Sequence, residues 1–397
     1  MTQQARPSAL LVSPEAPYPV RGGGAVRTAS VLEYLGRRYE LDLIAFRQPG
    51  APHPAAVLPP GLIRQLQVID LPYHAKSGLA RLVRNLPRYL RGCPPLVDRF
   101  GGFGRTVSGF LRGRNYELAV IEHSWCAPYL EQVAPHARRM VLDLHNIESV
   151  LYDRWARTAG WPLSVALRGY CRASLEVERR WLPGFSLLLA ASPEDSRAVR
   201  QIAPGPRCEV YPNTIPLAPQ PVQPEENVVI FSGTFDYAPN ISAVRFFRSE
   251  IWPLLRERWP ELRWRLVGLN PEAVKKHVRR DPRIELRGPV EDAIGAIAAA
   301  RVVVVPLLAG SGTRVKILEA WAAARAVVST SLGAEGLPGR DGEHLLLADT
   351  PKAFAGAVSS LLESAQTRRR LGEAGRALYE KHFTWETAWA ILERIGI

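Results

Sequence analysis

The sequence predicts an α/β protein of two Rossmann-like domains, each with a doubly wound parallel sheet, that face each other across a cleft. Short apolar runs typical of buried strands alternate with helical patterns along the whole chain. The length of 397 residues exceeds what one hydrophobic core usually needs. A proline-rich stretch near the middle, 212–227, divides the alternation into two halves.

The first half contains mostly continuous apolar runs, as expected for parallel strands that are buried on both faces. We expect strands at 9–13, 41–46, 67–71, 118–122, 141–144 and 187–191. We expect helices at 25–38, 79–91, 148–181 and 193–201. Together these elements form a first domain, 1–211.

The stretch 212–227 holds five prolines in sixteen residues, which favours an extended linker. After it the alternation restarts, and we expect a second domain over 228–382. Its strands are expected at 228–231, 263–267, 283–287, 302–306 and 326–330. Its helices are expected at 240–258, 271–280, 291–300, 314–324, 350–363 and 367–379. The segment 383–397 carries a last helix, which we expect to cross back to the first domain.

Composition excludes several classes of protein. The four cysteines form no Cys-x-x-Cys pair, which argues against a zinc site or a disulfide framework and fits a reducing compartment. The apolar run 9–12 is too short for a signal peptide, and 302–313 is too short to span a membrane. We therefore expect a cytoplasmic protein. Residues 1–220 hold 27 Lys and Arg against 17 Asp and Glu, so an anionic partner is expected on this half.

The segment 302–321 carries the clearest chemical pattern. An all-valine strand leads through a loop with Gly310 and Gly312 into a helix, and Thr313 is the expected N-cap. Unpaired N–H groups at a helix start attract anions, and Arg314 and Lys316 add two positive charges there.

Lys316 and Glu319 are three residues apart and so share a helix face. A cation at a diphosphate and a carboxylate one turn deeper, at a ribose diol, match a nucleotide diphosphate. The alternative is a charged surface helix with an ion pair of little energetic value.

Five segments resemble glycosyltransferases of the GT-B fold, family-4-like, particularly bacterial surface-polysaccharide sugar transferases. The glycine-rich segment 17–27 resembles their first loop, and 211–213 the entry to their linker. The segment 231–240 resembles the opening of their donor domain. Residues 310–319 and 329–337 resemble the donor-binding signature, which is the most specific of the five.

The resemblance implies a hexosyltransferase that moves a sugar, with retention, from a nucleotide-sugar donor to a glycan, a lipid-linked acceptor or a small molecule. Arg314 and Lys316 would neutralise the leaving diphosphate as catalytic residues, and no cofactor or metal is expected. Donor contacts are implied for Gly23, Gly24, Gly233, Gly310, Gly312, Thr313, Glu319, Glu335, Gly336 and Leu337.

The chain departs from the family in two places. The family's paired-glutamate motif has a second acid eight residues before Glu319, where this chain has Ser311. Many relatives also have an Arg and a Lys after the first strand of the donor domain. This chain has Thr234, Phe235 and Asp236 there, which leaves the phosphate charge to Arg314 and Lys316.

On the acceptor side, His145 follows the apolar run 141–144 and is the third expected catalytic residue. His123, after 118–122, is a weaker candidate of the same kind. The alternative for both is a structural histidine.

Two other functions are less well supported. A nicotinamide enzyme of the Rossmann type would need glycine or alanine where Val315 stands. A basic nucleic-acid-binding protein would need its charges grouped with aromatic strands or zinc-finger spacing, so we expect no nucleic-acid partner. His-Glu-x-x-His and Asp-x-Asp motifs are missing, and no metal site is expected.

The segment 76–114 predicts contact with an anionic membrane. It has nine basic residues against one acid, Asp98, and its first part has leucines at helical spacing. A basic amphipathic helix of this kind adsorbs to an anionic inner leaflet, so we expect peripheral attachment to the inner membrane face. The alternative is a helix whose leucines pack on the domain core.

Overall fold

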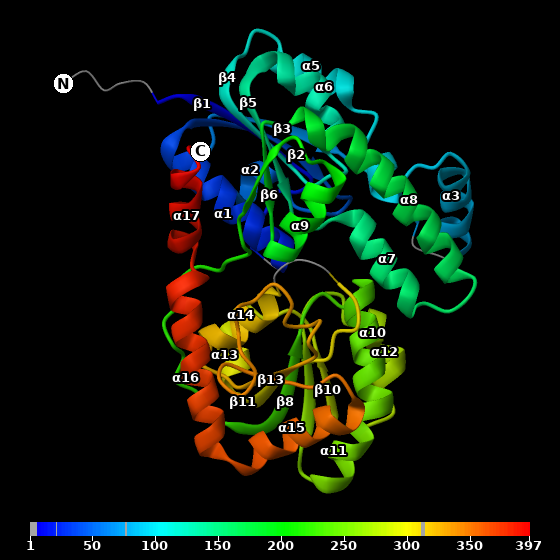
Figure 1. The fold of residues 1–397 in the computed structure, drawn as a ribbon, viewed down its shortest axis with the longest axis vertical. Coiled ribbons are helices and arrows are strands. Elements are labelled where there is room, and N and C mark those ends of the chain that lie inside the picture. The colour runs from blue at the N-terminus through cyan, green and yellow to red at the C-terminus, as the bar shows by residue number, and fades with distance from the viewer. Residues whose placement is uncertain (1–5, 21, 76–77, 311–313) are drawn as a thin grey trace, which may run out of the picture. The chain divides into compact units, whose positions relative to one another are not determined.

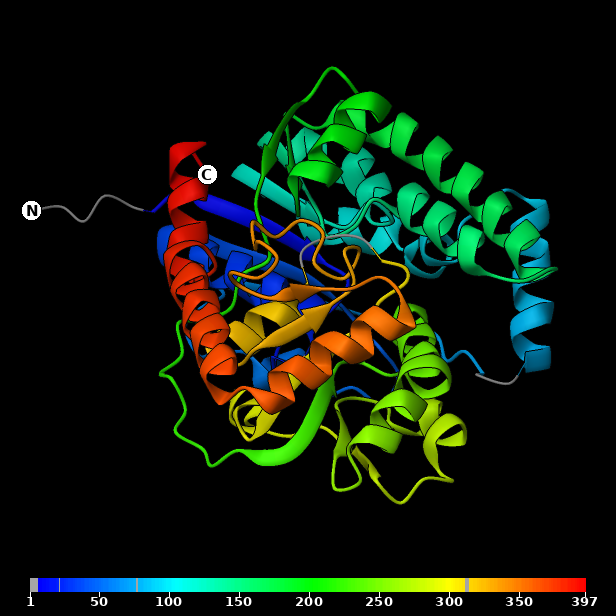
Figure 2. The same cartoon turned by 60° about the horizontal axis from the view of Figure 1, so that its bottom comes forward.

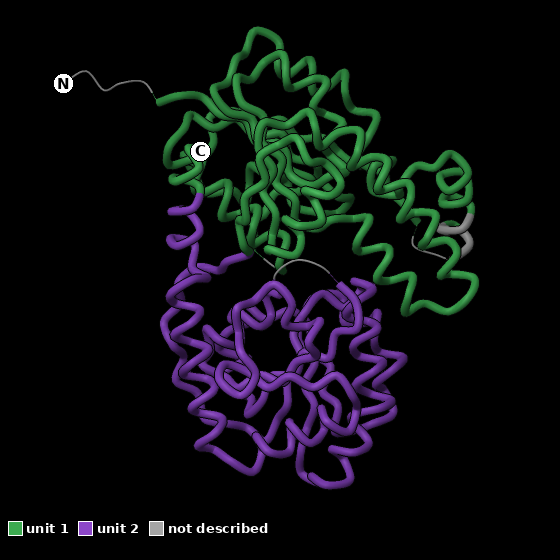
Figure 3. Tube along the Cα trace, viewed as in Figure 1, with its two compact units in different colours: residues 1–212, 392–397 green, residues 213–391 purple. Residues whose placement is uncertain are grey.

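The computed structural model describes residues 6–20, 22–75, 78–310 and 314–397. It divides into two compact units, residues 1–212 with 392–397 (unit 1) and residues 213–391 (unit 2), as Figure 3 shows. Each unit is a parallel sheet with helices on both faces (Figure 1). The predicted class of two doubly wound α/β domains is thereby confirmed. Within the described residues, no helix is long and apolar enough to cross a membrane.

The sheet of unit 1 has seven strands, all paired in parallel, in the order β3-β2-β1-β4-β5-β6-β7. The strands are β1 (Ser8–Ser13), β2 (Glu40–Arg47), β3 (Gln65–Asp70), β4 (Tyr116–Glu122), β5 (Ala137–Leu144), β6 (Leu187–Ala190) and β7 (Arg207–Val210). The central strands are buried on both faces, which explains their continuous apolar sequence. The short edge strand β7 was not expected, because it is less apolar.

The helices of unit 1 are α1 (Gly23–Arg38), α2 (Pro54–Val57), α3 (Gly78–Leu90), α4 (Pro95–Phe100), α5 (Gly104–Leu111), α6 (Leu130–Val133), α7 (Glu148–Thr158), α8 (Leu163–Trp181) and α9 (Pro193–Ile202). The expected single helix 148–181 is wrong, because α7 and α8 are separate helices that lie side by side (Figure 2). Gly160 and Pro162 explain the break, since neither favours a helix interior and the residue before proline disfavours helical geometry.

The sheet of unit 2 has six parallel strands in the order β10-β9-β8-β11-β12-β13. They are β8 (Glu226–Ser232), β9 (Arg263–Val267), β10 (Ile284–Arg287), β11 (Ala300–Val305), β12 (Val327–Ser329) and β13 (Leu346–Leu347). The helices are α10 (Ala238–Phe246), α11 (Trp252–Arg258), α12 (Glu272–Val278), α13 (Ala293–Ala298), α14 (Val315–Ala322), α15 (Pro351–Glu363), α16 (Ala365–His382) and α17 (Trp385–Arg394). The expected helix 240–258 contains a π-helical turn, Phe247–Ile251, and the two-residue β13 was not expected.

The proline-rich segment is extended and is hydrogen-bonded to side chains of α16. Tyr379 donates to the carbonyl of Pro216 (2.6 Å), and Arg376 donates to that of Ala218 (2.6 Å). The chain end belongs to unit 1, where the hydroxyl of Tyr34 donates to the carbonyl of Ile397 (2.5 Å).

Candidate functional site

Two cations and a carboxylate gather at the carboxyl ends of β8 and β11 in unit 2. Arg314 is the residue before α14, Lys316 lies in the first turn, and Glu319 follows one turn later. The Oε2 atom of Glu319 accepts a hydrogen bond from the hydroxyl of Ser232, the last residue of β8 (3.4 Å). In doubly wound sheets this edge is where ligands bind.

Lys316 is held by residues from two further elements. Its Nζ donates to Oδ1 of Asn240 on α10 (3.1 Å) and lies 5.3 Å from the centre of the Phe231 ring on β8. Gly233 faces the same ammonium, because a Cβ on this glycine would lie 3.7 Å from Nζ and 2.9 Å from Nδ2 of Asn240.

Arg314 packs on Gly310. A Cβ at Gly310 would lie 2.9 Å from Nη2 of Arg314, and the φ of 140° is one that side-chain-bearing residues rarely adopt. Nη2 also lies 3.5 Å from the carbonyl of Leu332, which joins Arg314 to the loop after β12. Glu335, Gly336 and Leu337 belong to this loop.

The structure thus brings Gly233, Gly310, Arg314, Lys316 and Glu319 together, with the loop of 335–337 adjoining Arg314. Gly312, Thr313 and Ser311 lie outside the described residues. The residue at the N-cap of α14 is Arg314, not the expected Thr313. Gly23 and Gly24 lie in unit 1, in the first turn of α1.

Burial changes the protonation of this cluster. Burial, and then the nearby Arg314, lowers the pKa of Lys316 to about 8, against the opposing effect of Glu319. Burial also raises the pKa of Glu319, against the opposing effects of Lys316 and Ser232. Arg314 and Lys316 beside the single carboxylate of Glu319 leave an excess of positive charge, which suits an anionic ligand.

Unit 1 has a second polar cluster, at the carboxyl ends of β4 and β5. Arg27 of α1 is 1 % exposed and grips Asp143, with Nε 2.9 Å from Oδ2 and Nη2 2.5 Å from Oδ1. Thr28 donates to Glu122 (3.0 Å). Nε2 of His145 lies 3.5 Å from a carboxylate oxygen of Glu122 and 3.5 Å from one of Asp143.

Both histidines proposed from the sequence belong to this cluster. The His123 ring stacks between His145 (3.8 Å between centroids) and Trp125 (3.9 Å). Burial lowers the pKa of His145, but the adjacent carboxylates of Asp143 and Glu122 outweigh this effect, so the pKa is raised. Burial and then the charge of His145 lower the pKa of His123 well below its usual range. The pKa values of the two contacting imidazoles are therefore shifted in opposite directions.

Glu122, Asp143 and His145 also offer ligand atoms within 4.8 Å of one another, a geometry that could hold a metal ion. The sequence predicted no metal site, because these residues are not adjacent in any metal-binding motif. The carboxylate of Asp143 already has a cationic partner, however, in Arg27. The carboxylates of Glu122 and Asp143 lie beside the His145 imidazole, and the guanidinium of Arg27 occupies both oxygens of Asp143.

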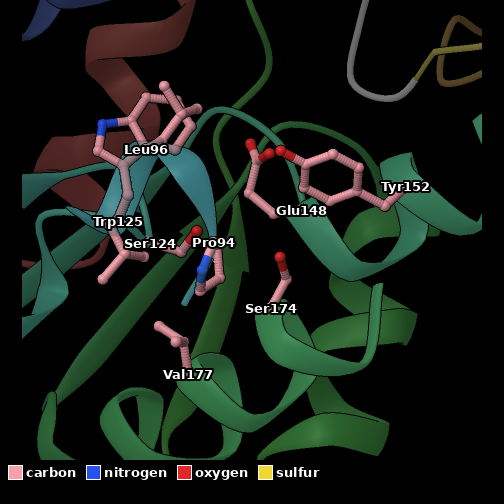
Figure 4. A pocket seen from close by; sticks show the side chains of 9 residues that line it. Pro94, Leu96, Ser124, Trp125, Glu148, Tyr152, Ser174 and Val177 are labelled. Carbon is pink, nitrogen blue, oxygen red and sulfur yellow. The ribbon is translucent and has the colours of Figure 1, made fainter. Parts of the chain in front are cut away.

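A pocket of unit 1 adjoins the second cluster through Trp125. Figure 4 shows Glu148, Tyr152 and Ser174 on one side and Trp125, Leu96 and Pro94 on the other. Burial, and then the charge of Glu178, raises the pKa of Glu148 to about 8. Its carboxyl group is therefore mainly protonated at neutral pH and can donate a hydrogen bond.

Sequence reasoning missed Asn240, Ser232, Arg27, Glu122 and Asp143. A signal existed for three of them, because Ser232, Glu122 and Asp143 are polar residues at or next to the carboxyl ends of apolar strands. Arg27 and Asn240 lie on helices, and their roles depend on partners 116 and 76 residues away.

Comparison with known proteins agrees with this geometry. Residues 226–364 match the family model of glycosyl transferases group 1. A protein of Klebsiella pneumoniae described as an uncharacterized 44.6 kDa protein in the cps region is 24 % identical over 135 residues, 32 % of this chain and 35 % of that protein. The chain thus matches about a third of this relative's length.

Solved structures resemble the chain over almost its whole length. Sucrose-phosphate synthase from Thermosynechococcus elongatus has a TM-score of 0.70 at 17 % identity and 98 % coverage of both chains. HepE from Anabaena, in complex with UDP and glucose, has a TM-score of 0.67 at 16 % identity, covering 97 % of this chain and 98 % of its own. TarM from S. aureus, in complex with UDP among other ligands, has a TM-score of 0.67 at 10 % identity, covering 98 % and 99 %. The chain therefore has the GT-B fold of glycosyltransferases, and its residues 226–364 are similar to glycosyl transferases group 1.

Proposed function

We propose that this glycosyltransferase transfers a hexosyl group, with retention, from a nucleotide-diphosphate sugar to a glycan or lipid-linked acceptor. The observation that carries the proposal is the site of Arg314, Lys316 and Glu319. Placing the buried guanidinium of Arg314 beside the half-buried ammonium of Lys316 costs folding free energy, and a diphosphate ligand provides a reason to keep the two cations together. As the bond from the anomeric carbon to the diphosphate breaks, its electron pair passes to the diphosphate, beside Lys316 and Arg314.

The donor assignment is tested by thermal unfolding with UDP, GDP, ADP and dTDP. We expect UDP to stabilise unit 2 most, since HepE and TarM were solved with UDP. A ligand at a hundredfold excess over its Kd should raise the Tm by roughly 5–10 °C. No shift with any of the four would contradict a nucleotide-diphosphate donor. Retention is tested by the anomeric configuration of the product in NMR spectra.

We propose that transfer needs no metal ion, because Lys316 and Arg314 match the charge of the leaving diphosphate. Full activity after dialysis against EDTA is the expected result. Loss of activity that Mg²⁺ or Mn²⁺ restores would contradict it, and Glu122, Asp143 and His145 would then be the first residues to replace.

We propose His145 as the acceptor-side catalytic residue. Replacing it by alanine is expected to lower kcat about a hundredfold with little change in UDP affinity, since a positioned proton donor or acceptor typically contributes that much. The matched control is His136→Ala, because His136 is half-buried and forms a hydrogen bond with the carbonyl of Arg114 (2.9 Å), away from the second polar cluster. A lower Tm with unchanged kcat would show that His145 is structural.

We propose that unit 1 attaches peripherally to an anionic inner leaflet through α3 and the neighbouring turn between α7 and α8. Val83, Leu86 and Leu90 are 65 %, 53 % and 76 % exposed, so these apolar side chains do not pack on the core. Trp161 in the turn is 84 % exposed. Charge supports the proposal less than the sequence suggested, because Arg88 is 5 % exposed and paired with Asp98 (2.7 Å). Lys76 lies outside the described residues.

Sedimentation with vesicles tests the attachment. The wild-type chain should bind vesicles with 30 % phosphatidylglycerol more than neutral ones, and Leu86→Ser with Leu90→Ser should lower binding at least about tenfold, because each loses apolar area. Val222→Ser is the control, since Val222 is even more accessible, at 96 %, but lies in the proline-rich segment. Equal binding to both vesicle types, or none, would contradict the proposal.

A further inference from the structure

Asn240 uses both ends of its side-chain amide at the site of unit 2. It is 4 % exposed, its Nδ2 donates to the carbonyl of Thr234 (2.9 Å), and its Oδ1 accepts from Nζ of Lys316 (3.1 Å). Turning the amide over would place a donor against the ammonium and an acceptor against the carbonyl. The orientation of the amide is therefore determined by its two partners.

The loop that precedes Asn240 and its helix α10 is itself fixed to the end of β9. Gly233 donates to the carbonyl of Val267 (3.0 Å), and Phe235 donates to that of Leu269 (2.8 Å). The two loops approach so closely that a Cβ at Gly268 would lie 1.8 Å from the carbonyl oxygen of Gly233. A side chain mounted on such a scaffold keeps a constant position, which a flexible lysine cannot do unaided.

Lys316 needs a partner of this kind. Four groups face its ammonium. Asn240 comes from α10 and Phe231 from β8, while Glu319 lies on α14 and Arg314 directly before it. Arg314 repels the ammonium, and burial removes water from it. The neutral oxygen of Asn240 and the ring face of Phe231 offset part of this cost without consuming the positive charge that a diphosphate needs.

We propose that Asn240 is a positioning residue that orients the Lys316 ammonium toward the leaving diphosphate. The contact between the two side chains does not depend on the proposed function. Only the identity of the ligand, a nucleoside diphosphate, rests on it.

Titration of the lysine side chains by NMR tests the contact directly. The chain has six lysines, so spectra of protein labelled with ¹³C-lysine are sparse, and Lys316→Arg identifies the signal. The six are Lys76, Lys275, Lys276, Lys316, Lys352 and Lys381. Two variants of nearly equal shape, Asn240→Asp and Asn240→Leu, both remove the donor to Thr234. They differ in the group that faces the Lys316 ammonium, which is a carboxylate in Asn240→Asp and an apolar side chain in Asn240→Leu.

The two variants should move the titration of Lys316 in opposite directions. Asn240→Asp adds a negative charge and should raise the pKa of Lys316, whereas Asn240→Leu removes the acceptor and should lower it. The two midpoints should differ by about one pH unit or more. Asn227→Leu at the start of β8 is the control and should leave the signal unchanged. Cooperative thermal unfolding shows whether each variant is folded, and an unchanged Lys316 midpoint in both folded variants would overturn the contact.

Calorimetry with UDP between pH 6.5 and 9.5 tests the positioning role. Asn240→Leu should weaken UDP binding about tenfold at neutral pH, as expected for loss of one oriented charge-assisted contact. Its alkaline loss of affinity should begin at lower pH than in the wild type. A shifted lysine titration with unchanged UDP affinity would overturn the positioning role. If wild-type protein binds no UDP, the donor proposal fails, while the lysine titration still decides the contact.

Discussion

Replacing Lys316 by alanine is expected to lower kcat by at least about a hundredfold, the usual effect of removing one preorganised electrostatic donor. The ammonium is held by Asn240 and Phe231 at the carboxyl edge of the sheet, so it needs no rearrangement when charge develops on the diphosphate. Because the pKa of Lys316 is lowered to about 8, the wild-type enzyme should also lose donor affinity as pH rises through that value. Steady-state kinetics over pH 6 to 9.5 measure both effects.

Arg314→Ala and Glu319→Ala should be similarly damaging for different reasons. Under the proposed function, Arg314 supplies the second positive charge, and Glu319 accepts hydrogen bonds from the ribose. Each variant should stay folded, since both side chains lie at the carboxyl edge of the sheet and neither belongs to the apolar core. Lys275→Ala is the matched control, because Lys275 lies on α12 and is paired only at the surface, with Glu272 (3.1 Å). Turnover near the wild-type value in all three site variants would refute the assignment of the donor site.

Arg27→Met is expected to destabilise unit 1 by about 3–5 kcal/mol, the usual cost of leaving one partner of a buried ion pair alone. Asp143 is 0 % exposed and would keep a buried charge with its main partner gone. Chemical denaturation followed by fluorescence measures the loss. The same change at Arg138, which is exposed and paired with Glu117 (3.1 Å), should cost less than about 1 kcal/mol.

The effect of Arg27→Met should shrink in acid. Burial raises the pKa of Asp143, but Arg27 and His145 outweigh it and lower the pKa to about 2 in the folded protein. A carboxyl group with a depressed pKa stabilises the fold above its unfolded value near 4, and this contribution disappears as pH falls toward 2. The difference between wild type and variant should therefore be full at pH 6 and smaller at pH 3. A constant difference over this range would show that the cost comes from packing and not from the charge of Asp143.

Much of the fold could be predicted because its pattern is local. The apolar run 302–306 corresponds to β11 (Ala300–Val305), and the helical pattern 193–201 to α9 (Pro193–Ile202), whose N-cap Ser192 accepts from the backbone of Asp195 (3.0 Å). Prediction failed for elements whose structure depends on a tertiary contact more than on their own sequence. β13 has only two residues and is a strand because it pairs with β12. An alternation of apolar and polar residues cannot be recognised over two positions.

The candidate site also has a part that the local sequence predicts and a part that depends on tertiary contacts. The spacing of Lys316 and Glu319 by itself predicted that their side chains share a helix face, because the two residues are three apart, and Arg314 stands directly before that helix. What each side chain touches was decided by the tertiary structure. Asn240 reaches Lys316 only because β8 lies beside β11 in the sheet, and Arg27 reaches Asp143 only because α1 packs over the ends of β4 and β5. Local periodicity assigns a side chain to a face of its own element, whereas the choice of partner depends on strand order and chain crossings that join residues about a hundred positions apart.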